Sequence, residues 1–174
     1  MATLTLIEEF LNTVDERSFT RHGQIHIGGE RLASARALAD WLADHGLADA
    51  GVEMEQTDLV DAIAFRTTLR QSLAGDVETA TAFADYPLQL APDRPGELRI
   101  AARTGRTWLD VIVETVTVAV CREDWRRIKL CAAPDCRWAF HDTSRSGRGR
   151  WCDMAVCGNR HKTRAYRERH QQAT

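Results

Sequence analysis

Two pairs of cysteines constrain this chain more than any other feature. Cys131 and Cys136 form one C-x4-C pair, Cys152 and Cys157 form the second, and residues 137–151 separate them. Two cysteine pairs brought together across a short loop supply the four soft ligands that a tetrahedral zinc ion takes. Four thiolates leave no coordination position open for water, so the spacing predicts a structural zinc ion and not a catalytic one.

Helix geometry limits how each pair can reach the metal. Residues five apart on a helix differ by about 140° around its axis, so both cysteines of a pair cannot face one ion from within a helix. Pro134 and Asp135 predict a turn inside the first pair, which makes it a knuckle. Cys152 is expected to precede a helix that runs to about His170, with Cys157 in or near the first turn of that helix.

The segment between the pairs predicts a hairpin. Trp138 and Phe140 alternate like one face of a strand, residues 144–149 predict a turn, and residues 150–151 begin the return strand. The order knuckle, hairpin and helix is that of a treble-clef-like zinc module. His141 and His161 are rival ligands, but four cysteines already complete the tetrahedron.

Residues 1–130 predict a helical N-terminal domain, so we divide the chain into residues 1–130 and residues 131–174. The fold class is mainly α with a small β-hairpin. Apolar side chains at helical spacing, with cap residues such as Ser34 and Gly46, predict helices at 4–16, 34–45, 58–75, 76–86 and 107–121. Alternating residues around 93–96 predict the hairpin, residues 17–31 are expected to form a loop, and Cys121 is expected in the core.

Asn12 and Thr13 interrupt the apolar stripe of the first predicted helix. A polar pair beside a core face either caps a neighbouring element or lines a ligand site, and we expect the first, structural role here.

The composition, 44% hydrophobic and 28% charged, is that of a soluble globular protein. No apolar run approaches the ~18–20 residues that span a bilayer, and the N-terminus lacks the basic start of a signal peptide. We therefore expect a cytoplasmic protein without membrane contact, in which clustered cysteines bind metal.

The charge is unevenly distributed. Residues 131–174 hold nine Lys and Arg against four Asp and Glu, whereas residues 1–130 hold 14 against 21. A basic tail on an acidic body is the arrangement expected when one end binds a polyanion. The alternative is a tail that docks on its own acidic body.

The cysteine segment resembles the CGNR zinc finger. The resemblance covers about 131–167 and rests on Cys131-Ala-Ala-Pro-Asp-Cys136, Asp142-Thr-Ser-Arg145, Arg150-Trp-Cys-Asp-Met154 and Cys157-Gly-Asn-Arg160. It implies zinc bound by Cys131, Cys136, Cys152 and Cys157. Phe10-Leu-Asn-Thr-Val14 and Ala39-Asp-Trp-Leu42 resemble weaker motifs of the ABATE domain that usually precedes this finger. Proteins of this kind are regarded as stress-induced bacterial transcription regulators, and His141 departs from the apolar residue expected at its position.

The basic residues of the tail are the expected nucleic-acid contacts. They lie on one face of the last helix, near its start and at the hairpin tip, where they can contact phosphates. The full set is Arg145, Arg148, Arg150, Arg160, Lys162, Arg164 and Arg167. Asn159 and Arg160 adjoin a zinc ligand, so they either stabilise the knuckle or reach base edges.

These observations favour a zinc-containing DNA-binding transcription regulator whose helical body binds a small-molecule effector or forms a homodimer. The alternative is a protein-interaction or assembly module with a structural zinc. RNA is a further candidate partner. The sequence lacks the P-loop, G-x-G-x-x-G, G-x-S-x-G and H-E-x-x-H motifs, so we do not expect an enzyme.

Overall fold

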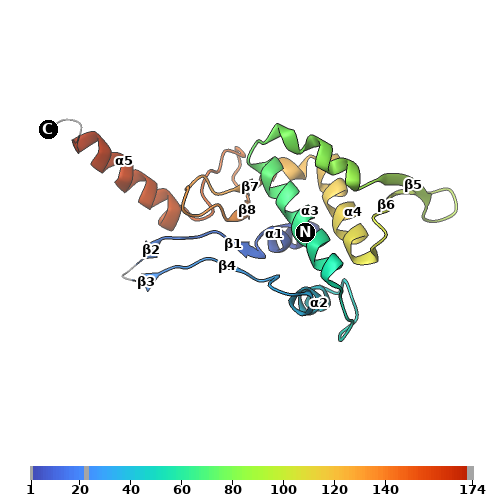
Figure 1. Cartoon of the computed structure of the whole chain (residues 1–174). Coiled ribbons are helices and arrows are strands. Elements are labelled where there is room, and N and C mark those ends of the chain that lie inside the picture. Colours follow the sequence, from blue (N-terminus) through green and yellow to red (C-terminus); the bar gives the residue numbers. More distant parts are fainter. Residues whose placement is uncertain (1, 22–23, 172–174) are drawn as a thin grey trace.

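The computed structural model describes residues 2–21 and 24–171. Within these residues the chain forms helices and short antiparallel strand pairs, which agrees with the mainly α expectation (Figure 1). The α-helices are α1 (Ala2–Leu11), α2 (Ala35–Asp44), α3 (Gln56–Leu73), α4 (Thr107–Cys121) and α5 (Asn159–Gln171). None of the described helices is both long enough and apolar enough to cross a bilayer.

The main core lies where α1, α3 and α4 pack together, with α2 against α3. Phe10 of α1 is fully buried, and its ring centroid lies 5.6 Å from that of Trp41 and 6.2 Å from that of Phe65. Burial of three aromatic side chains at such a point contributes several kcal/mol, of order 2–3 kcal/mol each. The apolar stripe predicted for the first helix is therefore confirmed.

The first helix ends earlier than predicted, at Leu11 and not near residue 16. The Thr13 backbone N–H and its hydroxyl both donate to the Phe10 carbonyl, at 3.2 and 2.8 Å. A polar side chain that competes for backbone acceptors in this way ends a helix.

Helix α2 begins as predicted, because the Ser34 hydroxyl accepts a hydrogen bond from the Ala37 backbone N–H at 3.1 Å. Gly46 follows its end at φ +66°, a conformation that favours glycine. Helix α3 begins slightly before the predicted Asp58. Glu55 is its N-cap residue, and the Asp58 carboxylate accepts from the Glu55 N–H at 2.8 Å in a capping box.

Residues 14–21 and 24–31 form an extended two-stranded arm, where a loop was predicted for residues 17–31. Strand β1 (Val14–Asp15) pairs with β4 (Gly29–Glu30), and β2 (Thr20–Arg21) pairs with β3 (Gln24–Ile25). Gly28 is required in this arm because a Cβ there would collide with the Asp15 carbonyl oxygen. The arm runs from α1 toward the first turn of α5 (Figure 1).

The predicted hairpin and the helix at 107–121 are both present. Strand β5 (Leu88–Pro92) pairs with β6 (Leu98–Ala102), and α4 follows. Short 3-10 helices at Val77–Asp85 and Asp124–Arg127 complete this part of the body. Cys121 is exposed, so its predicted core position is wrong: the inward stripe of α4 runs through Ile112 and Val116, and Cys121 lies on another side of the helix.

The hairpin of the cysteine segment (residues 127–170, called the finger below) uses a different partner strand from the one predicted. Strand β8 (Ala139–His141) pairs with β7 (Ile128–Leu130), which precedes the knuckle, and not with residues 150–151. Ile128 and Ala139 are buried in the main core, so this hairpin is anchored by hydrophobic burial that the local sequence pattern does not reveal.

Candidate metal centre

The four paired cysteines come together at one point. All four Sγ atoms lie within 4.8 Å of one another, with Cys136 and Cys152 3.6 Å apart and Cys152 and Cys157 3.8 Å apart. Four sulfurs at about 2.3 Å from a tetrahedral zinc ion lie about 3.8 Å from each other, so the spacing fits zinc. Neither His141 nor His161 belongs to this cluster.

Backbone hydrogen bonds shape the knuckle around the first pair. The Cys136 N–H donates to the Ala133 carbonyl at 3.0 Å, which closes the predicted turn at Pro134 and Asp135. The Cys131 N–H donates to the Trp138 carbonyl at 2.8 Å, and Arg137 between them adopts φ +51°. The chain thus reverses within a few residues and returns as β8.

A short π-helix, Met154–Gly158, carries the second pair into α5. The Asp153 carboxylate caps it by accepting from the Val156 N–H at 3.0 Å. Cys157 lies in this first turn, as predicted. A Cβ on Gly158 would come within 2.5 Å of the Met154 sulfur and 3.3 Å of the Trp151 ring, which accounts for glycine directly after the last cysteine.

The close approach of the four thiols favours a bound cation. The hydrogen bond with Cys131 raises the pKa of Cys136 to about 12, and Cys131 and Cys136 together raise the pKa of Cys152 above its ordinary value. A bound dication removes this cost because each thiolate then faces positive charge in place of a neighbouring thiolate. The donor set therefore fits a structural zinc ion held by Cys131, Cys136, Cys152 and Cys157.

Arg160 fastens the base of α5 to the knuckle. Its guanidinium donates to both carboxylate oxygens of Asp135, at 2.9 and 3.1 Å, and lies 3.8 Å from the Cys157 sulfur. The same guanidinium lies 3.7 Å from the centroid of the Phe19 ring, in the arm. The Arg160 side chain therefore contacts three segments: the knuckle, the turn that carries Cys157 and the arm.

Asn12 joins the finger to the helical body. Its side-chain amide donates to the Ala139 carbonyl and accepts from the Ala139 N–H, both at 2.8 Å and both buried. These two hydrogen bonds resemble those that a residue of one strand makes with a residue of a paired strand. Asn12 therefore binds the free edge of β8 as a neighbouring strand would. The structural role expected for Asn12 and Thr13 is confirmed. It was predicted because these two polar residues interrupt the apolar stripe of the first helix.

Arg70 of α3 makes a second connection that the sequence did not indicate. The buried guanidinium donates to the Leu11 and Arg137 carbonyls, each at 2.9 Å, and lies 3.0 Å from the Glu16 carboxylate. A buried arginine is tolerated when its donors are used in this way. The presence of an arginine on a predicted helix does not by itself indicate such a connecting role.

The arm also packs along the finger. The Ser18 N–H donates to the Asp135 carbonyl at 3.0 Å, and the Arg17 guanidinium lies 4.0 Å from the centroid of a Trp138 ring. Phe19 joins the finger's apolar cluster, which also contains Phe140 and is separate from the main core.

The loop at 142–149 is built around a buried carboxylate. Asp142 accepts from the Ser144 N–H at 3.0 Å, the Gly149 N–H at 2.7 Å and the Lys129 ammonium at 2.6 Å. The hydrogen bond from the Lys129 ammonium contributes most to holding the pKa of Asp142 well below its ordinary value. Gly149 is needed because a Cβ there would meet this carboxylate at 2.6 Å.

The remaining basic residues predicted to contact nucleic acid are on the surface. In the loop, Arg145 and Arg148 are exposed, and Arg150 lies with its guanidinium 5.2 Å from a Trp151 ring centroid. On α5 the exposed residues are Lys162, Arg164 and Arg167, and Arg164 reaches Asp135 only at 3.5 Å. Asn159 donates to the Ala155 carbonyl at 3.1 Å.

Part of the chain is similar to a known protein family. Residues 127–170 match the CGNR zinc finger. The match begins at β7 and ends with α5, so it includes the knuckle, the loop and the four cysteines. No curated protein matches the chain.

Proposed function

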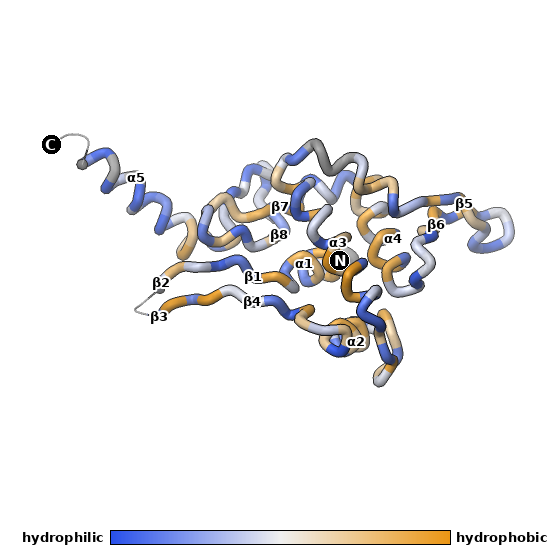
Figure 2. The backbone as a smooth tube through the Cα atoms, in the orientation of Figure 1, coloured by the Kyte–Doolittle hydropathy of each residue, from blue (hydrophilic) through white to orange (hydrophobic). Residues whose placement is uncertain are grey.

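We propose that the protein is a DNA-binding transcription regulator that contacts nucleic acid through the finger. The observation that carries the proposal is α5, which projects away from the helical body (Figure 1) and is hydrophilic along most of its length (Figure 2). Zinc fixes the base of this helix, and the helix presents its cations to solvent.

The composition of α5 supports a polyanion as its partner. The helix contains five Lys or Arg residues and one acid, Glu168. Like charges four residues apart, such as Arg160 and Arg164, destabilise an isolated helix, and a helix without a packed apolar face has little else to stabilise it. Phosphates that neutralise these cations would stabilise α5 and release counterions, which is the main source of non-specific affinity for DNA.

The contacts of Arg160 divide the basic residues into two groups. Arg160 is held by Asp135 inside the finger, whereas Lys162, Arg164 and Arg167 have exposed side chains. We assign phosphate contacts to this second group and to the loop residues Arg145, Arg148 and Arg150. Phosphate contacts position a protein on DNA without reading its sequence.

The acidic body fits the same proposal. Residues 1–130 carry seven more acidic than basic residues, so the body is repelled by a nucleic-acid backbone and the finger is left as the docking end. We propose that residues 1–130 form the ABATE-like domain and respond to a signal or assemble the protein.

Fluorescence anisotropy with a labelled duplex, in low salt and with zinc bound, tests the proposal. The double variant Arg164→Ala, Arg167→Ala should weaken binding on every duplex sequence tested. The matched control Arg36→Ala, Arg94→Ala removes two exposed arginines from the body and should leave binding unchanged. Absence of duplex binding by the wild-type protein would refute the proposal. Tighter binding of single-stranded RNA than of duplex DNA would indicate RNA as the partner in place of DNA.

A further inference from the structure

Helix α4 has apolar side chains on two sides, which a helix at the surface of a single chain does not need. One side packs into the core through residues such as Ile112 and Val116. On another side Val111 is 40% exposed and Val118 is 37% exposed. Together with Thr115 and Arg122 they follow the spacing i, i+4, i+7, i+11, which places them along one stripe.

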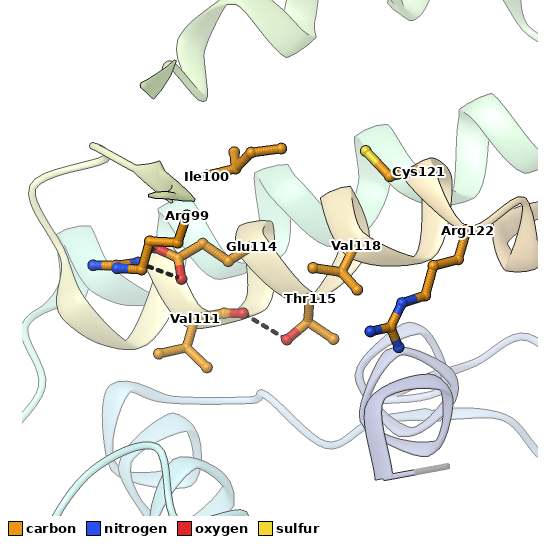
Figure 3. A pocket seen from close by; sticks show the side chains of 8 residues that line it. All are labelled: Arg99, Ile100, Val111, Glu114, Thr115, Val118, Cys121 and Arg122. Carbon is orange, nitrogen blue, oxygen red and sulfur yellow. Dashed lines mark hydrogen bonds and ion pairs between the residues drawn. The ribbon is translucent and has the colours of Figure 1, made fainter. Parts of the chain in front are cut away.

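This stripe is the floor of an open groove. Arg99 and Ile100 of β6 form the groove's wall, and the hollow between them and α4 measures about 560 Å³ (Figure 3). The apolar surface continues beyond the groove, because Ile100 is paired across the hairpin with Leu90, which is 70% exposed. We call this surface, Ile100 with Val111, Thr115, Val118, Cys121 and Arg122, the outer face.

The two ends of the outer face carry different charged groups, an ion-paired carboxylate and a guanidinium. Glu114 lies near one end, where its carboxylate accepts from Arg99 at 3.0 Å and from the Ala102 N–H at 3.0 Å. Arg122 lies at the other end, and its guanidinium makes no hydrogen bond or ion pair within the described residues. The surface is therefore complementary to a copy of itself turned end for end.

We infer that the outer face binds a second copy of this chain in a symmetric, antiparallel dimer. With the two-fold axis at Val118, each Val118 faces its counterpart, and Arg122 of each copy faces Glu114 of the other. Thr115 faces Cys121 across the axis. Such an isologous interface buries the apolar stripe of both copies at once and pairs the free guanidinium.

A second copy fits better than a small ligand because the apolar surface extends past the groove onto the hairpin. Leu88 and Leu98 are exposed on the same side of that hairpin as Leu90. Apolar patches that extend across two elements are typical of protein interfaces. The inference does not depend on nucleic-acid binding, since the outer face belongs to the body.

Sedimentation velocity on the full zinc-loaded chain tests the inference. The wild-type protein should sediment with twice the 19.6 kDa mass of one chain at sufficient concentration. Val118→Asp places two carboxylates together at the axis and should give the single-chain mass. The control Val60→Asp changes a valine on α3 that is 55% exposed and should leave the dimer intact.

Two further variants keep the test decisive should Val118→Asp fail to fold, which circular dichroism would show. Arg122→Glu is on the surface and should raise the dissociation constant of the dimer roughly tenfold or more. Val118→Cys should form a disulfide-linked dimer under mild oxidation, whereas Val60→Cys should not. A single-chain mass for the wild type at every concentration, or a dimer unaffected by both Val118→Asp and Arg122→Glu, would overturn the inference.

Discussion

Arg160 and Asp135 form a two-pronged ion pair, with N–O distances of 2.9 and 3.1 Å, that holds the first turn of α5 against the zinc knuckle. Both side chains are about a quarter exposed, so the pair is shielded from much of the solvent screening that weakens surface ion pairs. The direction in which α5 leaves the finger therefore depends on this contact as well as on the metal.

Arg160→Ala should lower the unfolding free energy of the finger by about 1.5–3 kcal/mol, because two charged hydrogen bonds are lost. Arg160→Lys should restore little of this, since an ammonium cannot make the planar two-pronged contact. Zinc affinity, measured by competition with a chromophoric chelator, should fall in both variants.

Arg164→Ala is the matched control for Arg160. Arg164 reaches the same carboxylate at only 3.5 Å and is mostly exposed. Its replacement should leave zinc affinity unchanged and weaken nucleic-acid binding. Equal loss of zinc affinity in the Arg160 and Arg164 variants would contradict the separate roles assigned to them.

Asn12→Ala should destabilise the connection between body and finger. It leaves the N–H and carbonyl of Ala139 buried without partners, at a cost of about 1–3 kcal/mol for each group. Urea unfolding followed by circular dichroism measures the loss. Asn159→Ala, which removes an exposed asparagine with one local hydrogen bond, should cost much less. Similar costs for the two variants would show that Asn12 does not hold the finger.

Local patterns in the sequence predicted the elements that depend on local physics. Helix α2 follows from Ser34 and Gly46, and the zinc cluster follows from cysteine spacing alone. The predictions were wrong where contacts between segments distant in the sequence determine the structure. Strand β8 pairs with β7 because Ile128 and Ala139 share the body's core. The turn signal at Pro134 and Asp135 predicted the knuckle but did not indicate this pairing.

The candidate site shows the same division. The ligands and the exposed arginines could be read from residue type and spacing. The sequence could not decide whether Arg160 has a structural role or contacts DNA bases, because its partners Asp135 and Phe19 come from separate segments. Arg70 was missed for the same reason: its acceptors are backbone carbonyls, which carry no sequence signal.

Removal of zinc should unfold the part of the finger around the cysteines and leave the body folded with the β7–β8 hairpin, because the apolar cluster around the cysteines is separate from the main core that buries Ile128 and Ala139. Zinc supplies about 10–16 kcal/mol in zinc-finger peptides, far more than this small cluster can supply by burial. Chelation should change the fluorescence of Trp138 and Trp151 and release one zinc ion per chain. Cys157→Ser should reproduce the effect, whereas Cys121→Ser, at the exposed fifth cysteine, should not. An unchanged finger after chelation would contradict a structural zinc.

Asp142 predicts a particular pH dependence. Its pKa in the folded protein is depressed below the ordinary value of about 3.9, so the folded state binds fewer protons than the unfolded chain in that range. The stabilisation is complete above pH about 5 and is lost as the pH falls toward the folded pKa. Asp142→Asn should therefore cost about 1.5–3 kcal/mol at neutral pH, through loss of the bonds from Lys129 and the loop N–H groups.

The gap in unfolding free energy between wild type and Asp142→Asn should narrow below pH about 4. Comparing the two proteins at each pH cancels the effect of acid on zinc binding, which both share. Asp93→Asn, at an exposed aspartate in the turn of the β5–β6 hairpin, is the control and should leave the unfolding free energy at neutral pH close to that of the wild type. A gap for Asp142→Asn that stays constant into strong acid would contradict the depressed pKa.

The salt dependence of duplex DNA binding tests the central claim most directly. A plot of log affinity against log salt should have a steep negative slope for the wild-type protein, since each neutralised phosphate contributes about 0.9. The variant Arg164→Ala, Arg167→Ala should bind more weakly and with a slope shallower by roughly 1.8, twice the contribution of one phosphate. A wild-type protein that fails to bind DNA in low salt with zinc present, or a slope unchanged in the variant, would contradict binding through α5.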